Sequence, residues 1–437
     1  MTCLNLLYSN DQRGQYPQSW YAATAEEIAR QPALSELVSC DVCIIGAGFT
    51  GLSAALTLAS SGVDVVILDA HRVGWGASGR NGGQLGSGQR LDQCELEAQY
   101  GRDHARALWD LAQESKQHVH ELIRQHNIEC DFHPGILHVD HKRRFGRETA
   151  AYVEKLNKDY QYDQISFLDQ ANLRERLASE HYYSGSVDTG AGHLHPLKLV
   201  TGYARAALQH NVRIYEATEV KSYTDSAERV VVKTGAGEVI AKQLLLACNG
   251  YLGNLNNQVA ASVMPINNYI IATEELDPAL ADALVSDRMA VADSKFVVNY
   301  FRVSADNRLL FGGRESYGYR FPADIKSFVR SAMLSVYPQL ENVSVDYGWG
   351  GTLAITMNRM PYIKQLGTNV ISSSGYSGHG VGMATLAGKI CAEAIKGKLD
   401  SFDVMASVDH MAFPGGTLLR SPLLKLGMLY YSLRDKL

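Results

Sequence analysis

The stretch between Asp41 and Asp69 constrains the fold more than any other part of this sequence. An apolar run, DVCIIG, leads into glycines at the spacing GxGxxG (Gly46, Gly48 and Gly51), and a second apolar run, VDVVILD, ends at Asp69. A strand, a glycine turn, a helix, another strand and a terminal acid, this close together, are typical of a dinucleotide-binding βαβ unit. The sequence therefore predicts such a unit here.

Each of these positions has a physical role in such a unit. The first glycine permits a tight turn, the second lets the backbone approach a pyrophosphate, and the third lets the helix pack closely on the strand. The helix, expected over 52–60, presents free N–H groups and the positive end of its dipole to the phosphates. Asp69 ends the second strand, where a carboxylate can accept both ribose hydroxyls. NAD and FAD both satisfy this pattern.

A second glycine turn, GYSGHGVGMATLAGK, favours FAD. It occurs far along the chain, after another predicted strand, and again leads into a helix. A nicotinamide-dependent enzyme usually completes a continuous Rossmann domain, whereas here β-rich segments intervene. FAD is long enough to need two anchors: one helix N-terminus for the pyrophosphate, and one for the pyrimidine carbonyl of the flavin, which gains negative charge on reduction. The alternative for residues 378–382 is close packing between helices.

The stretch GASGRNGGQ (76–84) comes shortly after the second strand, so we expect it to cross the mouth of the dinucleotide site. Its glycines would let the main chain pass over the pyrophosphate and the flavin ring. Arg80 and Asn81 would supply hydrogen-bond donors. The alternative is a flexible surface loop.

The rest of the pattern predicts an α/β fold of two discontinuous domains. A Rossmann-like FAD-binding domain is expected from 1–95, 185–262 and 345–437, and a substrate domain with a mixed, largely antiparallel sheet from 96–184 and 263–344. Periodicity predicts helices over 25–30, 92–126, 145–157, 167–177 and 195–208. It predicts antiparallel strands within 262–275, 294–304 and 307–315.

Charge and cysteine usage exclude several classes of protein. A net charge of -5 leaves no basic field, so no nucleic-acid partner is expected. Seven scattered cysteines form no disulfide framework, and no signal-peptide pattern occurs, so we expect the cytoplasm. The 22 residues Val42–Val63 carry no charge, but their four glycines fit the βαβ unit better than a membrane span.

Two short motifs have ordinary interpretations. Cys40 and Cys43 form a CxxC, yet Cys43 falls inside an apolar strand, so core packing is expected instead of a redox pair. Histidines 181, 193 and 195 have no second cluster at metal-ligand spacing, so no metal is expected.

At the level of motifs, the chain resembles the D-amino-acid-oxidase-like FAD oxidoreductases, the family of glycine oxidase and sarcosine oxidase. The resemblance spans nearly the whole chain. GRNGG, WGGTLAITMNR and the tail SPLLKLGMLYYSLRDKL are most similar to the gamma-glutamylputrescine oxidase subfamily. The motifs are IIGAGFTGLSAAL, GASGRNGGQ, GHLHPLKLV, ACNGY, NRLLFGGR, WGGTLAITMNRMP, GYSGHGVG and that tail.

The resemblance implies FAD-dependent oxidation of a C–N bond. A hydride leaves the carbon that bears the amine, the imine hydrolyses to an aldehyde and ammonia, and dioxygen becomes hydrogen peroxide. For this subfamily the substrate would be a putrescine acylated at one end by glutamate, on a route of polyamine breakdown.

The resemblance also implies a set of cofactor contacts. Val220 matches a backbone contact to adenine. Sarcosine oxidases link their flavin to a cysteine in the segment that here reads WGGTLAITMNRM, but no cysteine lies between Cys248 and Cys391, so the FAD is expected to be non-covalent. The expected cofactor-binding residues are Gly46, Ala47, Gly48, Phe49, Thr50, Gly51, Asp69, Ala70, Gly76, Ala77, Ser78, Gly79, Arg80, Asn81, Gly82, Gly83, Gln84, Val220, Asn249, Gly250, Gly378, His379, Gly380 and Val381.

The sequence identifies fewer candidate residues for substrate binding than for cofactor binding. The amine must be neutral, and an apolar pocket would lower its pKa by desolvating the cation. Aromatic rings could first attract that cation, although most of the 23 tyrosines must be ordinary packing. Lys295 and Arg314 are candidates for the cation that assists dioxygen, with solvated charges as the alternative, and no catalytic base is assigned. The aromatic candidates are Trp75, Tyr269, Tyr300 and Trp349.

Other functions stay open at this point. A dehydrogenase of the same fold would pass electrons to a quinone at a membrane, and the tail LLKLGMLYYSLRDKL is amphipathic enough to lie on a bilayer. Packing of that tail on the FAD domain explains it equally well. An oxidase of sarcosine, glycine or D-amino acids, and a flavoprotein without catalysis, are further alternatives.

Overall fold

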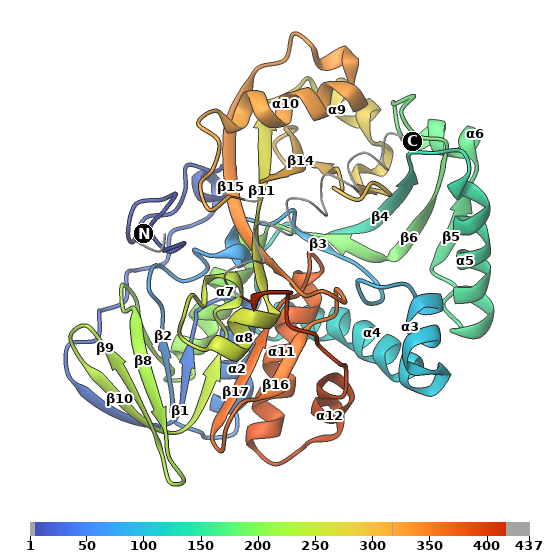
Figure 1. Cartoon of the computed structure of the whole chain (residues 1–437). Coiled ribbons are helices and arrows are strands. Elements are labelled where there is room, and N and C mark those ends of the chain that lie inside the picture. Colours follow the sequence, from blue (N-terminus) through green and yellow to red (C-terminus); the bar gives the residue numbers. More distant parts are fainter. Residues whose placement is uncertain (1–4, 317, 417–437) are drawn as a thin grey trace.

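Two β-sheets form the framework of the computed structural model, which describes residues 5–316 and 318–416 (Figure 1). The eight-stranded first sheet has the order β16-β17-β10-β1-β2-β7, with β9 beside β10 and β8 beside β9. Its strands from β17 to β7 are parallel neighbours, whereas β16, β9 and β8 join antiparallel. The strands are β1 (Leu37–Ile45), β2 (Val65–Leu68), β7 (Arg213–Tyr215), β8 (Val220–Asp225), β9 (Val230–Thr234), β10 (Glu238–Leu246), β16 (Tyr362–Gln365) and β17 (Val370–Ser374).

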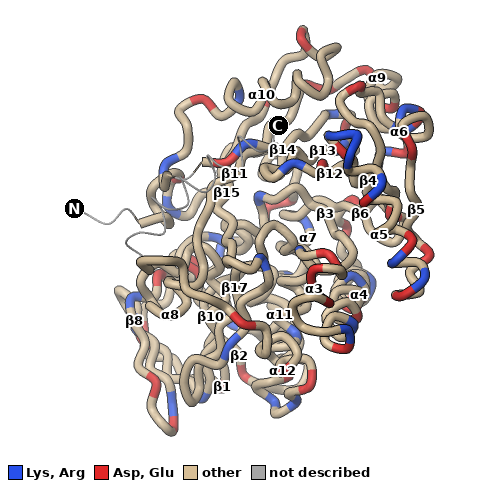
Figure 2. The backbone as a smooth tube through the Cα atoms, turned by 45° about the vertical axis from the view of Figure 1, so that its right-hand side comes forward, with Lys and Arg blue, Asp and Glu red and all other residues tan. Residues whose placement is uncertain are grey.

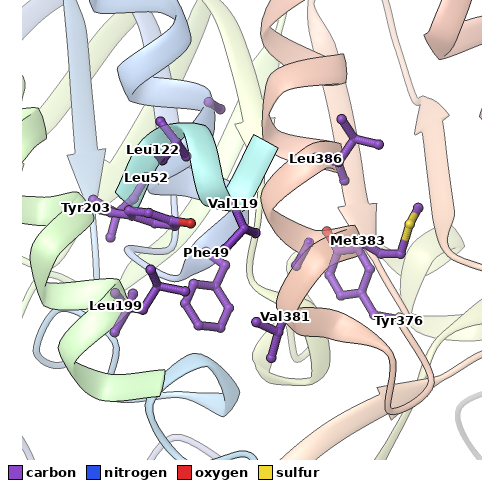
Figure 3. Packing of buried hydrophobic residues seen from close by; sticks show 14 of the residues in the cluster. Phe49, Leu52, Val119, Leu122, Leu199, Tyr203, Tyr376, Val381, Met383 and Leu386 are labelled. Atoms are coloured by element: carbon purple, nitrogen blue, oxygen red, sulfur yellow. The ribbon is translucent and has the colours of Figure 1, made fainter. Parts of the chain in front are cut away.

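Four helices cover one face of this sheet: α2 (Phe49–Ala59), α4 (Arg102–Gln125), α7 (Pro196–Gln209) and α11 (Gly380–Ile395). Successive residues of β1 point to opposite faces of the sheet. Ile44 packs among these helices, and Ile45 packs on the other face, towards β8 and β9. Figure 3 shows Phe49, Val119, Tyr203 and Val381 meeting where the four helices converge. Burial of this apolar cluster fixes the position at which α2 and α11 begin.

The nine-stranded second sheet has the order β15-β11-β14-β13-β12-β4-β6-β3, with β5 beside β6. The β4–β12 pair is parallel and the other described pairs are antiparallel. The strands are β3 (Gln84–Leu85), β4 (His133–Asp140), β5 (Ile165–Leu168), β6 (Ser184–His193), β11 (Met264–Thr273), β12 (Ala290–Asp293), β13 (Tyr300–Val303), β14 (Leu309–Ser316) and β15 (Val345–Ile355). The remaining helices are α1 (Trp20–Thr24), α3 (Gln93–Tyr100), α5 (Phe145–Asp159), α6 (Gln170–Arg176), α8 (Asn257–Ser262), α9 (Pro278–Leu284), α10 (Ile325–Val336) and α12 (Asp400–Ala406), with the short 3₁₀ helices η1 (Ala77–Gly79), η2 (Asn249–Tyr251), η3 (Ser286–Arg288) and η4 (Pro338–Leu340).

The predicted α/β fold with a second, largely antiparallel sheet is confirmed, as is the βαβ unit of β1, α2 and β2. Cys40 and Cys43 are buried free thiols, as core packing requires. The domain boundaries stay a prediction, and strand membership differs from them at three places. β3, β6 and β15 lie in the second sheet, although 1–95, 185–262 and 345–437 were assigned to the FAD-binding domain.

Two predicted helices are wrong. No helix covers 25–30, because the chain there is extended and bound to the first domain: Arg72 donates to the carbonyl of Ile28, and Gln31 N donates to Glu216. The single helix predicted over 92–126 is two helices, because Gly101 has φ +82° and ends α3 before α4 begins.

Lysines and arginines, and the acidic residues, are both scattered over the backbone of the described chain (Figure 2). Within the described ranges, no helix is both long and apolar enough to span a bilayer. The C-terminal tail SPLLKLGMLYYSLRDKL, with its predicted membrane or domain contact, lies outside the described residues.

Candidate functional site

The turn between β1 and α2 can be made only by glycine. Gly46 has φ +113°, and a Cβ there would lie 2.6 Å from the carbonyl oxygen of Ala247 at the end of β10. A Cβ on Gly51 would lie 1.9 Å from the carbonyl oxygen of Gly46. Main chain therefore approaches main chain at both positions, which permits the tight turn at Gly46 and the close packing of α2 on β1 at Gly51.

Asp69, at the end of β2, lies beside this turn. Its carboxylate accepts hydrogen bonds from Ala47 N (2.7 Å) and His71 N (2.8 Å). Burial raises the pKa of Asp69 to about 6, against these two N–H groups, which favour the carboxylate. Each carboxylate oxygen keeps a second lone pair, and the residue is only half-buried, so it can still accept two ribose hydroxyls.

The loop 76–84 has internal hydrogen bonds and contacts both α2 and the second sheet. Ser78 Oγ accepts the N–H of Phe49 (3.0 Å), the first residue of α2. Asn81 donates to the carbonyls of Ala77 and Ser78 (3.0 Å each) and accepts from Gly83 N (2.8 Å). Both amide hydrogens of Asn81 are thus used inside the loop, not offered outwards. Gln84 continues into β3 and donates to the carbonyl of Val291 in β12 (2.9 Å).

Arg80 is buried in this loop, with a relative exposure of 3%. It donates to the carbonyl of Trp75 (2.6 Å), to Asp11 Oδ2 (2.8 Å) and to the carbonyl of Gly350 (3.1 Å). Its Nη2 is buried without a partner among the described residues. An unpaired buried donor is costly, so this atom fits a ligand acceptor.

The second anchor lies at the start of α11. Asn249 Oδ1 accepts the N–H of Gly375 (3.0 Å), which joins the loop after β10 to the loop after β17. Gly378 has φ +90°, is exposed, and a Cβ there would meet no atom within 4 Å. Its glycine is therefore required by the backbone conformation and not by helix packing. Helix α11 then begins at Gly380 with no side-chain cap from His379, leaving N–H groups for a ligand.

Further predicted cofactor residues lie around these two anchors. Phe49 and Val381 point into the helix core (Figure 3), so only their main chain can face a cofactor. Thr50 Oγ1 bonds to the hydroxyl of Tyr376 (2.6 Å) and ties α2 to the loop between β17 and α11. Val220 is half-buried at the start of β8. The others are Ala70, directly after Asp69; Gly76, Ala77 and Gly79, at η1; Gly82, beside Tyr300; and Gly250, in η2.

His379 is neutral at pH 7, because burial and then Arg90 lower its pKa to about 4. Its ring lies against the loop that follows β3, since a Cβ on Gly86 would be 2.9 Å from His379 Cε1. A neutral imidazole here adds no fixed charge to the α11 N-terminus.

The four aromatic candidates differ in position. Trp75 is buried, and His71 stacks on its ring (3.7 Å, 5°). Tyr269 is fully buried in the second sheet, and Trp349 is buried with Nε1 donating to the carbonyl of Arg80 (3.1 Å). Tyr300 alone of the four is partly exposed, and its ring lies beside loop 76–84, 2.7 Å from a Cβ placed on Gly82.

The two side chains that are candidates for assisting dioxygen have their hydrogen-bond partners away from loop 76–84. Lys295 Nζ lies 2.9 Å from His181 Nε2. Arg314 donates to Ser331 Oγ of α10 (2.9 Å). No described contact connects either side chain to the loop 76–84 or to the start of α11, and both roles stay predictions.

Three residues near the loop were missed by sequence reasoning. Arg302 is buried and donates to the carbonyls of Gly82 (3.2 Å) and Leu194 (3.1 Å), which fixes the loop on β13. An arginine inside the apolar run YFRVS was a signal that could have identified it. Asp11 and His71 gave no local signal, because their partners are distant in sequence.

Taken together, these residues fit FAD. The carboxyl ends of β1, β2, β10 and β17 meet at one edge, two helix N-termini without a side-chain cap from their own N-cap residues begin there, and a half-buried carboxylate lies beside the first. This is the edge at which open α/β sheets bind nucleotides.

Comparisons with known proteins agree with this geometry. The family model described as FAD dependent oxidoreductase (DAO) matches residues 41–394. The chain is 43% identical over 418 residues to the probable oxidoreductase OrdL of Rhizobium meliloti (strain 1021), covering 96% of this chain and 97% of that protein. It is 40% identical over 427 residues to the gamma-glutamylputrescine oxidoreductase of Escherichia coli (strain K12), covering 97% and 99%.

A solved structure shows the same fold. Glycine oxidase from Geobacillus kaustophilus superposes with a TM-score of 0.73 at 20% identity, covering 86% of this chain and 100% of that one.

Proposed function

Because the chain belongs to the family of FAD-dependent oxidoreductases known as DAO, we propose that it is an amine oxidase acting on gamma-glutamylputrescine or a closely related acylated diamine. The observation that carries this proposal is the 40% identity, over 97% of the chain, to a protein named for that substrate. The overall reaction would convert the primary amine, dioxygen and water into an aldehyde, ammonia and hydrogen peroxide.

The residues around the two glycine turns would hold the cofactor. Asp69 would accept the ribose hydroxyls, the N-terminus of α2 would face the pyrophosphate, and the N-terminus of α11 would face the pyrimidine end of the flavin. Loop 76–84 would lie along the flavin, with Arg80 Nη2 as a free donor. When bound, FAD supplies the two-electron acceptor for the hydride that leaves the carbon bearing the amine.

The chain's own task on the substrate side is to bind and desolvate the amine. Tyr300 lies beside Gly82 and is partly exposed, so its ring is the aromatic surface best placed to meet a cationic amine. A half-apolar site there would lower the amine's pKa and favour the neutral form that can lose a hydride. The glutamyl end would supply binding energy remote from the reacting carbon.

The experiment is a substrate panel with peroxide as the readout. Purified holoprotein is given gamma-glutamylputrescine, putrescine, sarcosine and D-alanine at neutral and alkaline pH. The expected order of kcat/KM is gamma-glutamylputrescine, then putrescine, with the other two far behind. Removing the glutamyl group should lower kcat as well as raise KM, since remote binding positions the amine. FAD-free protein is the control.

Two outcomes would contradict the proposal in different ways. If sarcosine or the D-amino acid is the best substrate, the substrate assignment is wrong while the fold and cofactor stand. If a dye is reduced but no peroxide is released, the protein is a dehydrogenase that passes electrons to another acceptor.

A further inference from the structure

The N-terminal arm, residues 5–16, lies before the range that the family model matches and has no counterpart in the predicted cofactor contacts. It packs on the segment that follows Asp69. Gly14 N donates to His71 Nδ1 (3.1 Å), and His71 Nε2 bonds to the carbonyl of Leu7 (2.7 Å). Tyr16 OH donates to the carbonyl of Val73 (2.7 Å). Figure 1 shows this segment, in blue, at the level between the two sheets.

The arm also supplies the counter-charge for the flavin loop. Asp11 Oδ2 pairs with Arg80 Nη1 at 2.8 Å, and the two side chains are 14% and 1% exposed. Arg80 lies over the ring of Trp75 (4.4 Å), and His71 stacks on Trp75 (3.7 Å). A buried guanidinium without a carboxylate would be costly. The charge that makes burial of Arg80 tolerable therefore comes from outside the matched family range.

Further contacts fix the arm at its other points. Tyr8 OH donates to Glu219 Oε2 (2.7 Å), and Arg13 donates to the carbonyl of Ala217 (3.2 Å), both just before the predicted adenine contact at Val220. Asn10 exchanges hydrogen bonds with the main chain of Tyr319 and Phe321 beside the second sheet. The arm thus bridges the adenosine side, the flavin loop and the second sheet.

We propose that the arm is part of the cofactor site, and that Asp11 is a positioning residue that holds Arg80, and through it loop 76–84, in the form that binds FAD. The inference rests on the proposed assignment of that loop to the flavin. It predicts that FAD retention depends on a residue outside the range that the family model matches.

The test measures FAD binding and not turnover. Asp11→Asn is compared with Asp64→Asn, which removes a carboxylate that pairs with Arg213 at the same 2.8 Å distance but at the opposite end of β2. We expect Asp11→Asn to raise the Kd and the dissociation rate of FAD by about tenfold or more, the scale of a lost charge-assisted bond. Asp64→Asn should stay within about twofold of the wild type, the scale of an exposed ion pair.

A double-variant cycle separates positioning from general stability. If Asp11 acts through Arg80, adding Asp11→Asn to the Arg80→Met variant should change FAD affinity no further. Asp11→Asn should alter the visible circular dichroism of bound FAD in the protein that keeps Arg80, and should cause no further change in the Arg80→Met variant. Equal FAD affinity in Asp11→Asn and the wild type would overturn the inference. So would a fall in apoprotein Tm without a change in Kd, or additive effects in the cycle. Because no amine is used, these outcomes are independent of whether gamma-glutamylputrescine is the substrate.

Discussion

At the scale of single residues, we expect protonation of Asp69 to oppose binding of FAD. Burial raises its pKa to about 6, so the apoprotein holds a proton there below that pH. At the proposed cofactor site, ribose hydroxyls would donate to the ionised carboxylate, so FAD would compete with this proton. We expect the Kd of FAD to rise as the pH falls through about 6, measured by fluorescence titration of apoprotein.

Substitution of Asp69 distinguishes the titration of this carboxylate from the titration of other groups that could affect FAD binding. Asp69→Asn should flatten the dependence between pH 5 and 7, a window that follows from the pKa of about 6. At neutral pH it should weaken binding by roughly 1–3 kcal/mol. Asp140 is a matched control, because burial also raises its pKa but its partners are Thr149 in α5 and Ser184 in β6. An Asp69→Asn profile that keeps the full wild-type pH dependence would show that another group is responsible.

At the scale of elements, the two ends of α11 offer a matched comparison. Gly378 before the helix and Gly397 after it have φ of +90° and +87°, and a Cβ at either would meet no atom within 4 Å. Alanine at either position should cost about 1–2 kcal/mol of stability through backbone strain alone. Only Gly378→Ala should also raise the Kd of FAD, because only that turn faces the predicted site. Thermal unfolding and FAD titration of both variants test this. Equal Kd values of FAD for the two variants would show that the turn at Gly378 does not anchor FAD.

Elements set by neighbouring residues could be predicted from the sequence. The β1–α2–β2 unit and the α11 turn follow from glycine spacing and apolar periodicity within short windows. The helix predicted at 25–30 failed because contacts of Ile28 and Gln31 with Arg72 and Glu216, far along the chain, override local propensity. The Asp11–Arg80 pair was invisible for the same reason: nothing within the local sequence of Asp11 indicates its partner.

At the scale of the whole molecule, the distribution of cysteines bears on how FAD is held. No cysteine lies between Cys248 and Cys391, and the Cys248 thiol donates to the carbonyl of Ile45 (3.4 Å). His195 bonds through both ring nitrogens, to Thr24 Oγ1 and Lys198 N. We therefore expect acid precipitation to release yellow FAD into the supernatant. A yellow pellet over a colourless supernatant would contradict this and would direct attention to His193, whose Nδ1 has no described partner.

The first sheet is assembled from distant parts of the chain, and this order governs when the protein can acquire its cofactor during synthesis. β1 and β2 leave the ribosome early, β10 follows in mid-chain, and β17 with α11 comes late. A nascent chain can form the first anchor long before the second exists. On the proposed assignment, a polypeptide that ends before Gly380 would carry the adenosine-binding half without the second anchor, so FAD would be retained only after α11 has been synthesised.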